Sequence, residues 1–377
     1  MNTGVIHSKP HYPILDGLRG VAAVTVVCFH ILEAHATSHL DQVINHGYLA
    51  VDFFFLLSGF VIGYAYDDRW NRMSAGEFFK RRLVRLHPMV AMGSLVGALC
   101  FYWQASALWP LISQTPVAKM LLVMLIGCTL LPVPTSMDIR GWAEMHPLNG
   151  PAWSLFYEYI ANILYALVVR RFSRKALSLL VLISGAALIH LAVTSVNGDV
   201  IGGWSVDHAQ LHVGFARLMY PFFAGLLLCR MGKQVHTKNA FLYCSMLLLA
   251  MLAMPRIGGS THLWANGLYD SLGIIFIFPL IVLMGAGGTL AGKTARRSCK
   301  FLGGISYPVY ITHYPLIYIY TGWVSGTKPP VLQAFVFGVL LLLLSIALAY
   351  ACLKLYDEPV RKWLTAKFLS RPTGEKD

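Results

Sequence analysis

The chain has 377 residues, of which 56% are hydrophobic and only 12% are charged, about half the charged fraction of an ordinary soluble domain. This composition excludes a disordered chain, a fibrous chain and a secreted disulfide scaffold, and the mean hydropathy of +0.60 predicts an integral membrane protein. The formal net charge of +13 does not indicate a nucleic-acid partner, because no basic run is interleaved with aromatic residues on a polar segment.

Apolar segments follow one another along the whole chain, and most approach the roughly 20 residues that a helix needs to cross hydrocarbon. We therefore expect an all-α, polytopic transmembrane helix bundle that forms a single domain over residues 1–377, with a cytoplasmic tail over about 354–377. In chain order, the apolar segments are residues 13–34, 47–66, 84–103, 118–133, 151–169, 176–195, 210–229, 239–254, 268–288, 301–322 and 331–353.

Most of the 30 lysines and arginines fall in alternate connections between these segments. Basic residues collect in cytoplasmic loops, so we expect these connections and both termini on the cytoplasmic side of the inner membrane. The basic clusters lie at 69–85, 170–175, 230–238, 293–300 and 354–376.

The segment 118–133 decides the number of crossings. If every apolar segment crosses, the clusters at 69–85 and 170–175 fall on opposite sides. The segment is short and ends in Pro132 and Pro134, as is typical of re-entrant or interfacial elements. We expect about ten crossings and one re-entrant element at the outer face; the alternative is eleven crossings with the N-terminus outside.

Ionisable residues at membrane depth are costly and usually face an internal cavity. Counting about 1.5 Å per residue from the helix ends predicts two clusters. A cationic cluster at the cytoplasmic mouth suits a phosphorylated ligand, because guanidinium groups bind phosphate through paired donors; alternatively, it marks topology or binds lipid headgroups. A second cluster, at mid to outer depth, mixes acids, bases and hydroxyls. The first contains Arg19, Arg82 and Arg85, and the second His30, Asp52, Ser58, Glu158, Arg217 and His313.

The second cluster offers general base chemistry. The neutral ring of His30 can accept a proton near pH 7, and a carboxylate beside it can hold its tautomer. A lone intramembrane histidine can also serve only to hydrogen-bond a neighbouring helix, so the carboxylates at similar depth matter to the interpretation.

Six sequence blocks contain most of the polar residues discussed above. They are LDGLRGVAAVTVVCFH at 15–30, GYLAVDFFFLLSGFVI at 47–62, RRLVRLHP at 81–88, PAWSLFYEY at 151–159, GGISYPVYITHYPL at 303–316 and YDEPVRKW at 356–363. In this order, and over nearly the whole chain, the blocks closely resemble the acyltransferase-3 family of membrane enzymes.

The resemblance implies that an acyl group, most often acetyl, moves from a cytoplasmic acyl-CoA to a hydroxyl of a surface polysaccharide, a lipopolysaccharide or a lipid-linked sugar. It implies that His30 is the catalytic base and that Arg82 and Arg85 serve the acyl donor; Arg19, Glu158 and His313 match further family positions. Some relatives carry a hydrolase-like domain after the membrane part, and we expect none here.

We expect the coenzyme phosphates at the three arginines and the thioester near His30, with Glu158 or Asp52 orienting the ring. Acyl-CoA is then a donor substrate, and we expect no tightly bound cofactor, no metal and no nucleic acid. No GxSxG motif surrounds Ser58, which favours helix packing over a nucleophilic role. The acceptor cavity is expected to include Trp153, Ser154, Arg217, His313 and Ser58.

Two other functions compete with an acyltransferase. A transporter or flippase for an acyl donor or glycan precursor would also carry buried charges and a re-entrant element, but no inverted repeat is visible. A non-catalytic assembly subunit would leave His30 and the paired arginines without a purpose.

Overall fold

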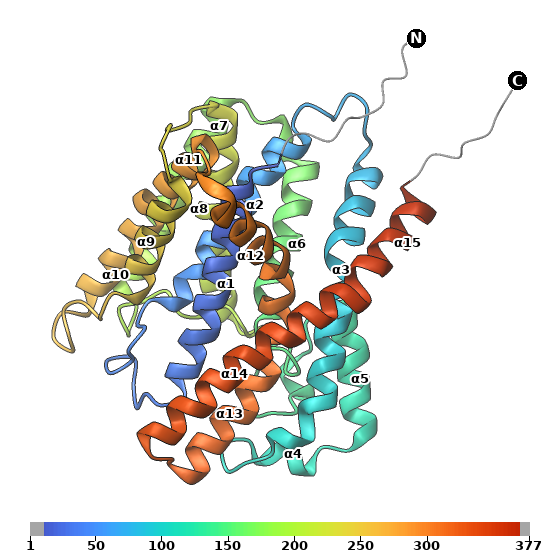
Figure 1. Cartoon of the computed structure of the whole chain (residues 1–377), viewed down its shortest axis with the longest axis vertical. Coiled ribbons are helices and arrows are strands. Elements are labelled where there is room, and N and C mark those ends of the chain that lie inside the picture. The colour runs from blue at the N-terminus through green and yellow to red at the C-terminus, as the bar shows by residue number, and fades with distance from the viewer. Residues whose placement is uncertain (1–10, 370–377) are drawn as a thin grey trace, which may run out of the picture.

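The computed structural model describes residues 11–369, so the extreme termini, both predicted to be cytoplasmic, lie outside the described residues. All regular structure in this range is helical, without a strand (Figure 1). Helical stretches that are long and apolar enough to cross a membrane number seven in this range: Pro13–Glu33, Gly47–Tyr66, Ala75–Gln104, Arg174–Thr194, His208–Met231, Leu263–Gly287 and Val331–Phe368. The prediction of an all-α membrane bundle is confirmed.

The helices run back and forth between two ends of the bundle (Figure 1). Two π-helical turns, Gly273–Ile277 and Leu353–Asp357, join α10 to α11 and α14 to α15 without breaking the helical path. The helices are α1 (Pro13–Glu33), α2 (Ala50–Tyr66), α3 (Ala75–Cys100), α4 (Pro110–Gln114), α5 (Val117–Cys128), α6 (Ala152–Leu167), α7 (Arg174–Thr194), α8 (His208–Met231), α9 (Ala240–Ala253), α10 (Leu263–Leu272), α11 (Phe278–Gly287), α12 (Gly292–Thr312), α13 (Tyr314–Thr327), α14 (Val331–Cys352) and α15 (Glu358–Phe368).

Local sequence explains where two of the functionally important helices start. At α3, the Ser74 side chain accepts a hydrogen bond from the Glu77 amide, and the Glu77 carboxylate accepts one from the Ser74 amide, which forms a capping box. At α13, Pro315 occupies the first turn, where a helix makes no use of the missing N–H. The junction between α12 and α13 therefore falls at His313, inside the bundle.

Glycines allow two helix pairs to pack at close range. A Cβ atom on Gly20 of α1 would collide with the Leu302 carbonyl of α12, and one on Gly59 of α2 would collide with the Phe222 carbonyl of α8. Small residues that let helix backbones approach are a common device in membrane bundles. These contacts fix α1, α2, α8 and α12, which carry many of the buried polar residues.

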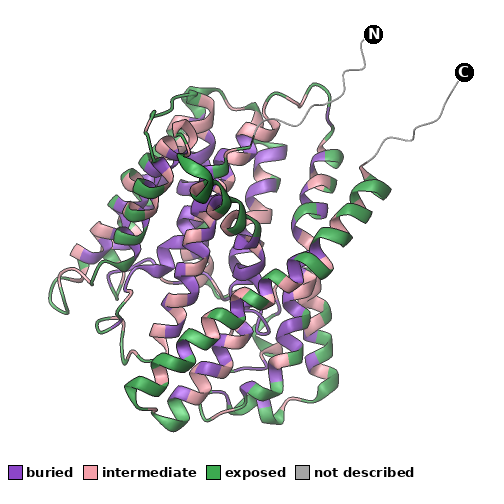
Figure 2. Cartoon of the chain, viewed as in Figure 1, coloured by how far each residue is buried: buried purple, intermediate pink, exposed green. Residues whose placement is uncertain are grey.

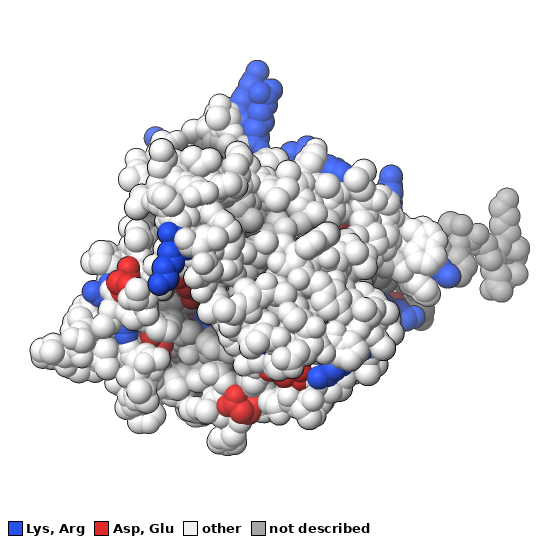
Figure 3. Space-filling view, turned by 90° about the horizontal axis from the view of Figure 1, so that it is seen from below, with Lys and Arg blue, Asp and Glu red and all other residues white. Residues whose placement is uncertain are grey.

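The basic connections meet at one end of the bundle, here called the basic end. Arg230, at the end of α8, forms an ion pair with Asp67 at 2.7 Å and donates to the Phe172 carbonyl at 2.9 Å. The Arg170 guanidinium lies 4.1 Å from the centre of the Trp70 ring. The opposite end carries only scattered charged side chains (Figure 3).

The short helix α5 enters the bundle and the chain then returns. The Lys119 side chain, at the start of α5, donates to the Asp138 carbonyl at 3.0 Å, so the chain after α5 comes back to the level where α5 began. Only then does it reach α6, and just before that helix the Asn149 side chain donates to the Ile311 carbonyl of α12 at 2.8 Å. Helix α6 therefore starts within the bundle, deeper than the predicted span 151–169 implied.

Figure 2 shows how buried and exposed residues are distributed over the bundle. Buried side chains concentrate on the helices at the centre, whereas α14 exposes apolar residues such as Leu340, Leu343 and Leu344. An outward apolar face of this kind suits lipid as solvent. The predicted tail is helical as far as Phe368, because α15 continues α14; residues 370–377 of it lie outside the described residues.

Candidate functional site

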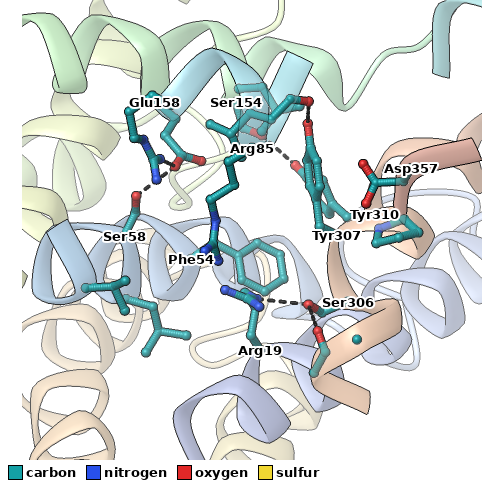
Figure 4. Close-up of a pocket in the computed structure, with 18 of the residues that line it drawn as sticks. Arg19, Phe54, Ser58, Arg85, Ser154, Glu158, Ser306, Tyr307, Tyr310 and Asp357 are labelled. Carbon is teal, nitrogen blue, oxygen red and sulfur yellow. Dashed lines mark hydrogen bonds and ion pairs between the residues drawn. The ribbon is translucent and has the colours of Figure 1, made fainter. Parts of the chain in front are cut away.

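A cavity of about 260 Å³ lies near the basic end and contains the predicted cationic cluster. We call it the arginine cavity (Figure 4). Helices α1, α2, α3, α6 and α12 and the start of α15 all contribute to its wall. Its polar lining residues are Arg19, Ser58, Arg82, Arg85, Ser154, Glu158, Ser306, Tyr307, Tyr310, Asp357, Glu358 and Arg361.

One side of the arginine cavity is an ordered ion pair. Arg82 Nη2 lies 2.6 Å from Glu158 Oε1, and the same carboxylate oxygen accepts a hydrogen bond from Ser58 Oγ at 2.8 Å. The Arg82 side chain is 9% exposed. Glu158 and Ser58 thus hold one guanidinium group in place, which reduces the conformational freedom that a ligand would otherwise have to remove.

The other side of the cavity presents guanidinium groups to the empty space. Arg19 donates from Nε to Ser306 Oγ at 2.9 Å, and its Nη2 lies 3.2 Å from Asp16. Arg85 has no hydrogen bond or ion pair with any residue in 11–369 and extends toward Arg19 (Figure 4). Arg19 and Arg82 repel the charge of Arg85, whereas Asp16 attracts it; an anion between the three guanidinium groups would reduce their mutual repulsion.

A second cavity, of about 430 Å³, lies farther from the basic end and contains His30. We call it the histidine cavity. Its wall is rich in aromatic side chains, and it also carries two carboxylates. The lining residues include Phe29, His30, Glu33, His39, Tyr48, Val51, Trp142, Glu144, Trp153, Trp204, Arg217, Tyr310 and Tyr314.

The contacts of His30 leave one ring nitrogen available. Nδ1 lies 2.7 Å from Glu33 Oε2. Because an ionised carboxylate only accepts hydrogen bonds, Nδ1 carries the hydrogen, and in the neutral ring Nε2 is the basic atom. The His313 ring stacks on His30 at a centroid distance of 5.7 Å, and Tyr314 contacts it edge-on at 4.7 Å. The ring is therefore positioned on three sides.

The carboxylate beside His30 differs from the predicted one. Asp52 pairs with Arg217 at 2.7 Å, and Glu158 pairs with Arg82. The prediction that Asp52 or Glu158 orients the His30 ring is therefore wrong. Asp52 projects from α2 toward α8, and the deep start of α6 places Glu158 in the arginine cavity.

Glu33 was missed in the sequence, although a signal for it exists. It lies three residues after His30 on the same helix, and residues at that spacing are neighbours on a helix surface. Depth counted along separate helices favours carboxylates from other helices, whereas the carboxylate nearest along the chain makes the contact.

The other predicted cavity residues divide between the two sites. Trp153 and Arg217 line the histidine cavity, whereas Ser58 and Ser154 line the arginine cavity, which corrects the prediction for the two serines. His313 is fully buried behind His30 and lines neither cavity.

The pair formed by Asp52 and Arg217 shapes the wall of the histidine cavity. Arg217 also donates to the Tyr48 carbonyl at 2.8 Å, and its guanidinium lies 5.2 Å from the centre of the Trp153 ring. Both charged side chains are buried, so removing either one would leave an uncompensated charge. The pair therefore fixes Trp153 and the α2–α8 contact.

The two cavities share part of one wall. Val51 and Tyr310 line both of them. The Tyr310 hydroxyl is 2.7 Å from Ser154 Oγ, and its ring meets Phe54 edge-on at a centroid distance of 5.3 Å. A molecule that occupied both cavities would pass this wall, with one part near the arginines and another near His30.

A second missed carboxyl group belongs to the connection before α6. Glu144 accepts hydrogen bonds from the Tyr318 hydroxyl at 2.6 and 2.7 Å, and Arg140 Nε lies 3.5 Å away. Burial raises the pKa of Glu144 to about 7 in spite of Arg140. No motif surrounds Glu144 in the sequence, and only the fold shows that it lines the histidine cavity.

The described part of the chain contains no candidate metal-binding site. No group of three or more His, Cys, Asp or Glu side chains in residues 11–369 is arranged to hold an ion. His46, close to two other histidines in sequence, instead contacts the Met254 carbonyl at 2.7 Å and the Asn266 side chain at 3.0 Å.

Comparison with known proteins identifies a family that the sequence matches. The model of a family described as an acyltransferase domain, acyltransferase-3, matches residues 12–353. "Protein 2 in picA locus" of Rhizobium radiobacter is 32% identical over 187 residues, which cover 47% of this chain and 92% of that protein.

Two longer relatives carry an activity in their names. "O-acetyltransferase OatA" of Staphylococcus aureus is 23% identical over 388 residues, covering 98% of this chain and 61% of the relative. "Peptidoglycan O-acetyltransferase OatA" of Listeria monocytogenes is 22% identical over 373 residues, covering 94% and 57%. The match thus spans about three-fifths of the length of these relatives. No solved structure matches the chain.

Proposed function

The chain belongs to the acyltransferase-3 family, and from this premise we propose that it is a membrane O-acetyltransferase. It transfers an acetyl group from acetyl-CoA to a hydroxyl of a surface glycan or a lipid-linked sugar. The names of the Staphylococcus and Listeria relatives support O-acetylation. The observation that carries the proposal is the wall shared by two cavities: one holds Arg85, whose guanidinium group is unpaired among residues 11–369, and the other holds a histidine with a free basic nitrogen.

The arginine cavity binds the phosphates of the donor. Arg85 offers its whole guanidinium group, and Arg19 and Arg82 are held beside it by Ser306 and Glu158. Guanidinium groups bind phosphate oxygens in pairs, with charge-assisted hydrogen bonds about twice as strong as neutral ones. The pantetheine arm then extends past Val51 and Tyr310 and presents the thioester to the histidine cavity.

The histidine cavity supplies the base. His30 Nε2 takes the proton of the acceptor hydroxyl as that oxygen attacks the thioester carbonyl carbon. A C–O bond forms, the C–S bond breaks, and the departing thiolate of coenzyme A takes the proton from the imidazolium. Glu33 holds the tautomer and stabilises the charged ring. Base catalysis supplies roughly 10²- to 10⁴-fold, and the positioning of both substrates supplies much of the rest.

We place the protein in the cytoplasmic membrane with the basic end facing the cytoplasm. The convergence of the basic connections at one end supports this orientation, because lysine and arginine favour cytoplasmic loops. About ten crossings follow if α5 is a re-entrant element, as the contact of Lys119 with Asp138 supports. The arginine cavity then opens toward the compartment that holds acyl-CoA.

A transfer assay tests the proposed function. Purified full-length protein is incubated with acetyl-CoA labelled in the acetyl group and with oligosaccharide acceptors, and the products are analysed by mass spectrometry. We expect an acetyl ester on the acceptor and one free thiol for each ester. A transporter would instead move label into sealed vesicles without forming an ester, and that result would contradict the proposal.

A further inference from the structure

The closing sequence block, YDEPVRKW, has no role in the steps above, yet it reaches the arginine cavity. The π-helical turn Leu353–Asp357 and the first turn of α15 both contribute to the wall. Such turns shift the helical register and are frequent at functional sites. Here the turn brings a fourth guanidinium group to the cavity. The cations among its described lining residues are Arg19, Arg82, Arg85 and Arg361.

Arg361 differs from the other three arginines in its place along the cavity. Helix α15 runs toward the basic end (Figure 1), so Arg361 lies one turn nearer to that end than Asp357 does. Its side chain is 36% exposed, compared with 9% for Arg82. It therefore stands on the mouth side of the cavity rather than at the shared wall.

The contacts of Arg361 leave donors for a ligand. Its Nη2 lies 3.0 Å from Asp357 Oδ2, which anchors the side chain. Its Nε is buried and has no hydrogen-bond partner among residues 11–369, and Oδ1 of Asp357 is also unpaired. The side chain as a whole is 36% exposed, so its outer N–H groups, rather than the buried Nε, are the donors that an acceptor oxygen of a ligand can reach.

Coenzyme A carries its negative charge in two separate places. The diphosphate joins the nucleoside to the pantetheine arm, and a third phosphate sits at the 3′ position of the ribose. In the proposed function, the arm points toward His30, which places the diphosphate at Arg19, Arg82 and Arg85. The ribose then lies on the mouth side, where Arg361 is the remaining cation of the described lining.

We propose that Arg361 binds the 3′-phosphate of the coenzyme A donor and thereby selects acetyl-CoA over acetyl donors that lack this group. The inference rests on the proposed function. It assigns a task to the last sequence block: α15 closes the mouth of the cavity and adds a planar, paired donor for a phosphate. Asp357 balances the charge of Arg361 when the donor is absent.

A comparison of two donors in two proteins tests the assignment. The KM of the purified full-length protein is measured for acetyl-CoA and for acetyl-dephospho-CoA, which lacks only the 3′-phosphate. In the wild-type protein, we expect KM to be about 10-fold or more higher for the dephospho donor, as for the loss of one charge-assisted hydrogen bond. In Arg361→Ala, we expect the two KM values to become equal, because only the KM for acetyl-CoA rises.

Two further variants sharpen the test. Arg361→Lys keeps the charge without the planar fork, so its preference for acetyl-CoA should fall between those of wild type and Arg361→Ala. Lys362→Ala changes an exposed neighbour that does not line the cavity, and it should keep the full preference.

The outcomes separate this inference from the proposed function. If the wild-type protein transfers acetyl groups but shows no preference between the two donors, the assignment of Arg361 is overturned and the proposed function stands. The same holds if Arg361→Ala raises both KM values equally, as a purely structural role would. If the wild-type protein transfers nothing from acetyl-CoA, the proposed function itself fails.

Discussion

The two cavities use opposite ways of handling charge. The arginine cavity gathers guanidinium groups and leaves Arg85 without a hydrogen bond or ion pair to any described residue. The histidine cavity pairs its charges internally, with Arg217 bound to Asp52 and His30 bound to Glu33, and covers the rest of its wall with aromatic rings. The first arrangement suits an anionic ligand, as proposed above, whereas the second pairs its own charges and presents one basic nitrogen.

In the proposed function, the arginine cavity binds the donor and the histidine cavity carries out the transfer. Changes in the arginine cavity should alter the affinity for the donor, and changes around His30 should alter the rate at saturating donor. Val51 and Tyr310 line both cavities, and in the proposed function the donor reaches from one cavity into the other past these residues. Variants in either cavity therefore test whether donor affinity and catalytic rate change independently.

The largest effect is expected for His30→Ala. Without the basic nitrogen, kcat should fall by about 10²- to 10⁴-fold, while the KM for acetyl-CoA stays near the wild-type value because the arginine cavity is intact. Steady-state kinetics with labelled acetyl-CoA measure both constants. Retention of most of kcat would show that another group takes the proton.

Arg85→Ala should produce the converse result. Loss of the unpaired guanidinium should raise the KM for acetyl-CoA by about 10-fold or more and leave kcat at saturation nearly unchanged. Lys233→Ala removes a cation that is exposed at the same end of the bundle but lies outside the cavity, and it should change neither constant. An equal effect of both substitutions would indicate general attraction at the membrane surface.

A smaller loss is expected for Glu33→Gln. The amide oxygen can still accept the hydrogen bond from His30 Nδ1, but the negative charge that stabilises the imidazolium is gone. We expect kcat to fall by about 10-fold, as for other groups that orient a functional histidine, with an unchanged KM for acetyl-CoA. A substitution at Glu33 without any effect on kcat would mean that the ring is positioned by His313 and Tyr314 alone.

The smallest effect concerns pH and Glu144. The pKa of this carboxyl is raised from 4.5 to about 7, so folding favours its neutral form. That contribution to stability is full below about pH 4.5, decreases as the pH rises toward about 7 and is lost above it. In thermal unfolding between about pH 5 and about pH 8, the Tm of the wild type should fall by a few degrees relative to Glu144→Gln. Parallel Tm curves would contradict the raised pKa.

The sequence was sufficient for features that depend on local pattern. Apolar runs located the membrane helices, and the alternation of basic connections predicted loops that the structure brings together, as the contact of Arg230 with Asp67 shows. The spacing of Arg82 and Arg85, three residues apart on one helix, predicted a shared face, and both line one cavity with Arg19.

The remaining features depend on where irregular segments start and stop. Helix α6 begins inside the bundle because the chain after α5 turns back, and this shift moves Glu158 from the histidine side to Arg82. The π-helical turn before α15 brings Arg361 to the cavity from a segment that was predicted to be a tail. Both residues lie in recognisable sequence blocks, but the turns that shift them do not follow the helical period, so depth counted along ideal helices could not place them.

In the proposed function, donor and acceptor enter the protein from opposite sides of the membrane, and the arginine cavity binds the donor. Reconstitution into sealed vesicles of determined orientation, with labelled acetyl-CoA supplied to one face and an oligosaccharide acceptor to the other, tests it most directly. We predict acetylated acceptor only when acetyl-CoA is added at the basic end of the protein and the acceptor at the opposite end. Product formed only when both substrates are added at the basic end would contradict the account.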